Sequence, residues 1–264
     1  MKFVKTHANC FLADWYSIMK THSECFQEDN THPKATGIFA YAQIVFNTCV
    51  YAIEHNGEVK VINNDLSYLS NATIGETVSF GNYYIEKEKS PMEWIVIDKN
   101  KDIHAMLLLS KYAIDCMKYN LTYNSIDWKK SEVREWLNGP CYDDAFNDDE
   151  KDFIRQRDIY NNENPTYKTT SGEDTKDKVF LLSYKEIMKY LDQDSLKCEA
   201  TEYAIKKGVY VESGNRYCDW WTRTAGDISS NVMYVSNEGE IVMEGDYCTT
   251  DDFGIRPAMY IRYE

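Results

Sequence analysis

The segment Cys218-Asp-Trp-Trp-Thr-Arg-Thr-Ala-Gly226 and the turn Gly254-Ile-Arg-Pro-Ala-Met259 decide the expected fold of this 264-residue chain. A tryptophan pair with a nearby arginine opens the region, and a Gly-x-Arg-Pro turn closes it. Between them, polar and aromatic residues crowd around regularly placed glycines. This layout predicts a rigid frame that carries a chemically variable surface, which favours recognition over catalysis.

Short strands are expected throughout residues 216–264, because apolar and polar residues alternate over short stretches between turn residues. Asn237-Glu-Gly239 predicts a tight hairpin turn between two of them. The predicted strands are Trp220 to Thr224, Val232 to Val235, Glu240 to Met243 and Arg256 to Tyr263.

Strands are also expected earlier, from Gly75 onward. Glu76 to Tyr84 and Met92 to Asp98 alternate as strands do, and a charged turn that contains Pro91 is predicted to join them. Ala105 to Ser110 is a continuous apolar run, which predicts a strand that is buried on both faces.

Helices are expected in the middle of this part. Val133, Trp136 and Leu137 form one apolar face that ends at Gly139-Pro140, where glycine and proline stop a helix. Two capping boxes are predicted to begin further helices, the first at Asn147 with Glu150 and the second at Ser183 with Glu186. The second follows an apolar strand, Val179 to Leu182. Residues 161–178 read as a long loop, and loops of that length are usually functional or mobile.

Residues 1–72 differ from the rest of the chain. Ile38, Ala42, Val45, Phe46, Cys49 and Ile53 recur at helical spacing, and an earlier helix is expected around Cys10 to Thr21. We therefore predict a helical N-terminal subdomain over 1–72 and a second domain over 73–264. Helices combined with short strands indicate an α+β fold.

The charge excludes two classes of partner. The chain has 43 acidic and 29 scattered basic residues, for a formal net charge of −14. Nucleic acid and anionic membranes require clustered lysine and arginine, so neither is expected as a partner. Twenty-one tyrosines suit half-buried sheets and binding surfaces, because tyrosine combines contact area with a hydrogen-bonding tip.

The cysteines indicate no metal or haem site. They lie at 10, 25, 49, 116, 141, 198, 218 and 248, and no Cys-x-x-Cys spacing occurs. Free thiols in a reducing compartment are the expected state. We expect neither a cofactor nor a metal. No signal peptide is visible in the first twenty residues, so we expect a cytoplasmic protein.

A series of ordered motifs resembles a known family. The motifs are Gly75-Glu-Thr-Val-Ser-Phe-Gly81, Glu93-Trp94, Leu107-Leu-Leu-Ser-Lys111, Arg134-x-Trp136-Leu137-Asn138, Asp174-Thr-x-Asp177-Lys-Val-Phe-Leu-Leu-Ser183, Trp220-Trp-x-Arg223 and Gly254-x-Arg256-Pro-Ala258. They resemble a widespread bacterial family of uncharacterised domains whose C-terminal half is similar to a C-type lectin fold. The resemblance spans about residues 74–264 and implies a C-type lectin-like ligand-binding domain over 73–264.

The closing segment is also similar to the variable proteins of diversity-generating retroelements. In those proteins a C-type lectin scaffold displays residues that are diversified by adenine-directed mutagenesis, and it binds protein or other surface ligands. The resemblance implies non-enzymatic binding of an unknown protein or surface ligand through residues 227–253. The candidate ligand-binding residues are Trp221, Arg223, Asp227, Ser229, Asn231, Tyr234, Asn237, Asp246, Tyr247, Thr250, Asp251, Asp252 and Phe253.

The chain departs from the resembled families at two points. Thr222-Arg-Thr-Ala-Gly226 stands where the family usually has Leu-Arg-Ser-Pro-Gly. The Glu-Pro-Asn and Trp-Asn-Asp triplets of calcium-dependent sugar-binding lectins are missing, so calcium-dependent sugar binding is not expected.

Alternatives remain open for several residues. Arg256 is interpreted as a structural residue that ties strand ends together through buried contacts. Arg223 either has the same structural role or belongs to a ligand platform. Trp221 either belongs to that platform or is a core residue, and the core interpretation is favoured. Asp174 and Asp177 either cap turns or ligate calcium, and two carboxylates are too few to fill a calcium site. An oxidase that resembles formylglycine-generating enzymes and uses Cys218 with Cys248 is one alternative function. A structural module that assembles through residues 1–72 is another.

Overall fold

The apolar run that predicts a buried strand forms β3 (Ala105–Ser110), and every residue of it is buried. In the computed structural model, which describes residues 68–85 and 88–263, β3 lies inside a six-stranded sheet. The other strands of this sheet are β1 (Thr77–Tyr84), β2 (Lys89–Asn100), β13 (Ala258–Arg262), β5 (Ile154–Arg155) and β8 (Val179–Phe180). Strands β1, β2, β3 and β13 lie side by side, and β5 and β8 both pair with the outer side of β13.

The prediction that Pro91 belongs to the turn before the second strand is wrong. Strand β2 begins at Lys89, and Pro91 lies inside it, opposite Asn82 of β1. Strand β3 pairs with β2 only from Trp94 onward, so within the described residues no strand pairs with the second side of β2 at the proline. A proline cannot donate a backbone hydrogen bond, and it is tolerated in a strand where no partner needs one.

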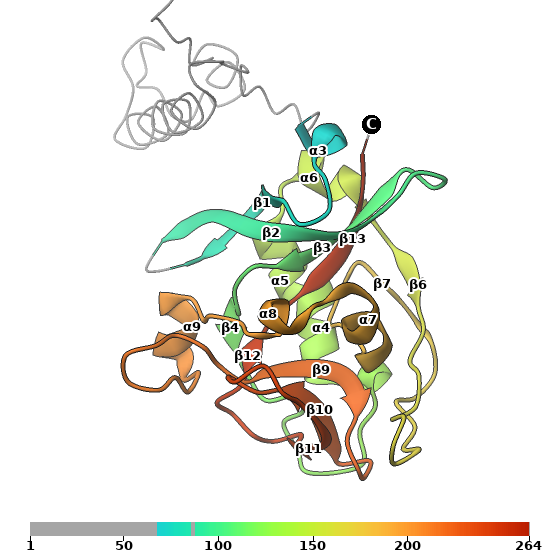
Figure 1. The fold of residues 1–264 in the computed structure, drawn as a ribbon, viewed down its shortest axis with the longest axis vertical. Coiled ribbons are helices and arrows are strands. Elements are labelled where there is room, and N and C mark those ends of the chain that lie inside the picture. Colours follow the sequence, from blue (N-terminus) through green and yellow to red (C-terminus); the bar gives the residue numbers. More distant parts are fainter. Residues whose placement is uncertain (1–67, 86–87, 264) are drawn as a thin grey trace, which may run out of the picture. The chain divides into compact units, whose positions relative to one another are not determined.

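A second sheet contains the segment that opened the sequence analysis. It has five strands in the order β11-β10-β9-β12-β4, and it lies below the larger sheet in the view of Figure 1. A separate two-stranded sheet joins β6 to β7, which lies inside the predicted long loop 161–178. The bounds are β4 (Asp115–Cys116), β9 (Trp220–Ala225), β10 (Asn231–Val235), β11 (Ile241–Tyr247), β12 (Gly254–Ile255), β6 (Arg157–Ile159) and β7 (Thr175–Asp177).

Short helices, several with side-chain caps, complete the fold. Both predicted capping boxes are present, at Asn147 with Glu150 and at Ser183 with Glu186. The predicted helix that ends before Gly139 is α4, and Ser131 caps its N-terminus. The bounds are α3 (Tyr68–Asn71), η3 (Trp128–Lys130), α4 (Glu132–Asn138), α5 (Pro140–Ala145), α6 (Asp148–Phe153), α7 (Tyr184–Tyr190), α8 (Gln193–Leu196) and α9 (Glu202–Lys207).

The Gly-x-Arg-Pro turn joins the two sheets. The chain leaves the smaller sheet at β12 and enters the larger one at β13, with the buried Arg256 between them. Arg256 donates to Ser110 O (3.0 Å) and Ser195 O (2.8 Å), as its structural interpretation requires. Gly254 is needed because a Cβ there would lie 2.6 Å from that of Ala113. The motif therefore fixes the path of the chain where it passes from the smaller sheet to the larger one.

The described residues have a mixed α and β structure with mostly antiparallel strands, so the coarse fold class is confirmed. The helices predicted within 1–67 lie outside the described residues, and the domain boundary at 72/73 stays a prediction. In the part of the chain that the structure describes, no helix has the length and apolar character needed to cross a membrane.

Candidate functional site

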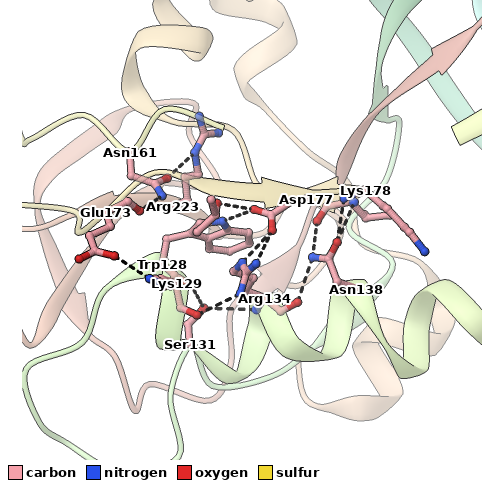
Figure 2. Close-up of polar contacts among 12 residues, drawn as sticks. Trp128, Lys129, Ser131, Arg134, Asn138, Asn161, Glu173, Asp177, Lys178 and Arg223 are labelled. Carbon is pink, nitrogen blue, oxygen red and sulfur yellow. Dashed lines mark hydrogen bonds and ion pairs between the residues drawn. The ribbon is translucent and has the colours of Figure 1, made fainter. Parts of the chain in front are cut away.

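The motif around Asp177 forms a buried polar network that supports the fold (Figure 2). The Asp177 carboxylate accepts hydrogen bonds from Trp128 Nε1, Thr175 Oγ1 and Arg134 Nε, each at 2.7 Å. Asn138 closes the network, since its side chain accepts from Lys178 N and donates to Val179 O. This carboxylate has its full set of protein partners, so it favours the structural interpretation over a calcium ligand.

Asp174 has a similar role, because its carboxylate accepts from the backbone N–H of Asn161 at 2.9 Å. No group of three or more acidic, cysteine or histidine side chains in the described ranges has the arrangement of a metal site.

Arg223 projects from β9 into the same interior. Its guanidinium donates to Leu181 O (2.6 Å), Tyr160 O (3.2 Å) and Asn161 Oδ1 (3.1 Å), and it forms an ion pair with Glu186. Arg223 is only 2% exposed, so it joins β9 to the segments before and after β7 and cannot meet a ligand at the surface.

Three predicted ligand-binding residues are therefore reassigned. Trp221, Arg223 and Phe253 are buried, and the rings of Trp221 and Phe253 contact each other at 4.3 Å between centroids. They belong to the frame that supports the surface, because their side chains pack against neighbouring segments. Trp221 also donates from its ring to Met117 O at 3.2 Å.

The predicted long loop is packed onto the smaller sheet through Asn164. The side-chain amide of this fully buried residue donates to Ala225 O (2.9 Å), Gly226 O (3.2 Å) and Met243 O (2.8 Å). It thereby joins the loop to the end of β9 and to β11, which are 61 and 79 positions away in sequence. The loop is a structural connection, because its central side chain satisfies buried carbonyl groups.

We expect Asn164→Ala to lower the free energy of unfolding by about 2 kcal/mol, because it leaves buried carbonyl oxygens without a donor. Urea unfolding measures the change. Asn162→Ala is the matched control, since its half-buried side chain makes none of these bonds, and it should change the value by less than about 0.5 kcal/mol. Equal effects of the two substitutions would contradict the role of Asn164.

Three half-buried carboxylates gather around Tyr234 on one face of the smaller sheet. Asp219 precedes β9, Asp246 lies in β11, and Asp252 lies in the loop before β12. No ion pair joins any of the three to a lysine or arginine of the described residues. The Tyr234 ring packs on Phe253 with centroids 4.7 Å apart, so the buried frame holds it in place.

Burial, and then the proximity of these carboxylates to one another, raises the pKa values of Asp219, Asp252 and Tyr234. Burial raises the pKa of Asp219, and the charges of Asp252 and Asp246 raise it further. Burial also raises the pKa of Asp252, together with the charges of Asp251 and Asp246. The pKa of Tyr234 is raised by burial and then by Asp219, Asp246 and Glu244. The cluster is thus an uncompensated patch of negative charge, and Asp252 Oδ1 is a buried atom without a hydrogen-bond partner among the described residues.

Two exposed tyrosines lie at the end of β11, where Tyr247 directly follows Asp246 in the chain. Tyr123 and Tyr247 are 55% and 56% exposed, and their rings meet edge to face with centroids 5.2 Å apart. Ser230 Oγ and the Tyr123 hydroxyl are 3.1 Å apart, which ties the loop that holds Tyr123 to the turn before β10. We name the set Asp219, Asp246, Asp251, Asp252, Tyr123, Tyr234 and Tyr247 the acidic tyrosine surface.

The remaining predicted site residues form turns beside this surface. Asp227 Oδ1 accepts from Asn231 Nδ2 at 2.9 Å, and Ser229 O accepts from Ile126 N. Asn237 N donates to Asp219 Oδ1 at 2.7 Å. Thr250 N donates to Tyr247 O, and Asp251 lies 3.7 Å from the Lys118 ammonium.

Sequence reasoning missed Asp219 and Tyr123. Asp219 had a local signal, since alternation along a strand places it on the same face as Trp221. Tyr123 had none, because its contact with Tyr247 joins residues more than a hundred positions apart in sequence.

The structure does not bring together the cysteines of the oxidase alternative. Cys248 Sγ donates to Thr122 O, whereas Cys218 lies beside Cys198 and donates from its backbone N–H to Cys198 O at 3.0 Å. The hydrogen bond with the Cys198 thiol, together with burial, raises the pKa of Cys218 well above its usual value. Both proposed cysteines are buried, and each makes its own set of contacts.

Comparison with protein families assigns the chain to a class. A family model described as a domain of unknown function (DUF6273) matches residues 104–263. This is more than half of the chain, so the protein belongs to that family. The matched region runs from the turn before β3 to the end of β13, and it includes the acidic tyrosine surface. No curated protein and no solved structure matches the chain significantly.

Proposed function

We propose that this protein is a non-enzymatic binding protein that holds a positively charged segment of a partner protein on the acidic tyrosine surface. The observation that carries the proposal is the gathering of Asp219, Asp246 and Asp252 around Tyr234 without a basic partner among the described residues. Leaving these carboxylates uncompensated is electrostatically unfavourable for the free protein, and a lysine or arginine of a partner would relieve it.

The side-chain chemistry of the surface supports recognition of a protein. Tyrosine supplies a large and rigid contact area, and its hydroxyl group adds a hydrogen bond. Tyr123 and Tyr247 are exposed, and their rings already contact each other. Binding a partner would therefore cost these two side chains little conformational entropy. Arginine and lysine side chains can also stack on their faces.

We further propose the C-type lectin-like fold and the relation to variable proteins of diversity-generating retroelements. The pairing of the C-terminal strand β13 with the earlier strand β3, beside a smaller separate sheet, supports the fold. The division between buried frame residues and surface residues supports the relation to variable proteins. Frame residues such as Trp221 and Arg256 are buried, whereas Asp246, Tyr247 and Asp251 reach the surface between them.

Selection from a displayed library of random short peptides tests the proposed function. We expect the retained peptides to be enriched in lysine and arginine, and the double variant Tyr123→Ala/Tyr247→Ala to bind them about tenfold more weakly. Tyr160→Ala is the control, because that tyrosine is 65% exposed and lies outside the surface. Peptides without a basic bias, or full binding by the double variant, would refute the proposal.

A further inference from the structure

A groove separates the helices that follow β8 from the beginning of β11. It has a volume of about 580 Å³, which is within the range of clefts that bind ligands. Its apolar lining comes from Ile187, Met188, Leu191, Leu196 and Ile241. The groove therefore combines α7, α8 and the β10–β11 hairpin, which are brought together only by the fold.

Some residues that line the groove are held by the core, and another is exposed and can change its conformation. Ile187 and Leu196 are 1% and 7% exposed, so they are held by the core. Met188 is 59% exposed, although an apolar side chain of this size gains free energy from burial. Methionine is flexible and can adjust to the shape of an incoming side chain. An apolar occupant would thus cover surface that is now in contact with water.

The rim of the groove is acidic. Asp192 and Glu240 line it, and none of the described residues that line it is basic. Ile241 is also the first residue of β11, which is an edge strand of the described sheet. Edge strands present unpaired backbone groups, and an extended chain can pair with them while placing alternate side chains into pockets.

This groove is separate from the acidic tyrosine surface. Ile241 is opposite Val235, whereas Val242 is opposite Tyr234. Successive residues of a strand point to opposite faces of the sheet, so Ile241 and Tyr234 lie on different faces. Occupation of the groove therefore leaves the carboxylates around Tyr234 free.

We propose that the groove binds an extended peptide segment of another protein, which places one large apolar side chain between Met188 and Ile241. Lysine or arginine residues beside the apolar side chain meet Asp192 and Glu240. An open groove beside the start of an edge strand fits a peptide, because the backbone of a peptide can extend the sheet at the start of β11, ahead of Met243 O, which Asn164 already binds, while an apolar side chain enters the groove.

The test uses two displayed peptide libraries with random flanking residues, one with a fixed central leucine and one with a fixed central serine. We expect retention of the leucine library, enrichment of lysine and arginine in its flanks, and retention about tenfold lower for Met188→Asp. Equal retention of the two libraries, or full binding by Met188→Asp, would overturn the proposal.

Three further variants separate this site from other effects. Met188→Leu should bind as the parent protein does, because it keeps the apolar wall. Met188 is largely exposed, so Met188→Asp should unfold at the same temperature as the parent protein. A second variant, Glu240→Lys, should lose the preference for peptides with basic flanking residues, because Glu240 lines the groove. The double variant Tyr123→Ala/Tyr247→Ala should retain the leucine library. Loss of that library in this double variant but not in Met188→Asp would assign it to the acidic tyrosine surface and refute the groove.

Discussion

Replacement of Arg223 by leucine is expected to lower the free energy of unfolding by about 3–5 kcal/mol, the range for breaking a buried ion pair from one side. The substitution leaves the Glu186 carboxylate without its ion-pair partner, and it leaves Leu181 O and Tyr160 O without the hydrogen bonds that Arg223 donates. Lysine should not rescue the loss, because one ammonium group cannot reproduce the planar set of donors that spans these acceptors.

Urea unfolding followed by tryptophan fluorescence measures this effect, since five of the six tryptophans lie in the described residues. Arg155→Leu is the matched control, because it is the same substitution at an exposed position. We expect it to lower the free energy of unfolding by less than about 0.5 kcal/mol. A loss below about 1 kcal/mol for Arg223→Leu would show that the buried contacts matter little.

The locally encoded parts of the fold could be predicted from sequence. Both capping boxes were predicted correctly, since the two residues of each box are three positions apart and bond to each other's backbone. The apolar run of β3 was also correct, because a strand buried on both faces needs no polar alternation. These signals lie within one turn or one strand, so no distant contact had to be known.

Features that depend on distant segments could not be predicted. The sequence leaves both a ligand-binding and a buried structural role open for Arg223, because nothing near it reveals that Tyr160, Leu181 and Glu186 surround its guanidinium. The same limit applies to the loop 161–178. Its composition is typical of a free loop, yet Asn164 joins it to β9 and β11.

The candidate site shows both cases at once. Tyr247 and Asp251 are exposed and Asp246 and Asp252 are half-buried, and these residues could be selected from sequence because they lie between glycines and frame residues in one short segment; their ligand-binding role stays a prediction. The charge cluster itself was not predicted, since Asp219 and Asp252 are 33 positions apart and meet only after β9 and β12 have paired.

Replacement of both Asp219 and Asp252 by asparagine is expected to weaken binding of the selected basic peptides about a hundredfold, or 2–3 kcal/mol, because each carboxylate pairs with a partner cation in a half-buried position. The shape of the surface should persist. Asparagine is nearly isosteric with aspartate, and its side-chain oxygen can still accept from Asn237 N at position 219. Titration calorimetry at two salt concentrations measures the affinity and its electrostatic part.

The same variant should be more stable than the parent protein, by about 1 kcal/mol at pH 7, since removal of unfavourable surface charge commonly has this effect. The pKa values of Asp219 and Asp252 are raised in the folded state. The folded protein therefore holds more protons than the unfolded chain between the unfolded and folded pKa values. The free energy of unfolding falls as pH rises through that window, and the loss is complete above the folded pKa. Asparagine does not titrate, so the advantage of the variant should be small in acid and should grow to a plateau towards neutral pH.

Asp102→Asn/Asp152→Asn is the control for this prediction, because it removes the same charge at two exposed positions outside the surface. We expect it to change neither the affinity beyond about twofold nor the stability beyond about 0.5 kcal/mol. A control that weakens binding as strongly as the test variant would mean that the partner responds to net charge alone. Opposite changes of affinity and stability in the test variant are the outcome that a dedicated binding surface requires, because the repulsion that destabilises the free protein is what a basic partner removes.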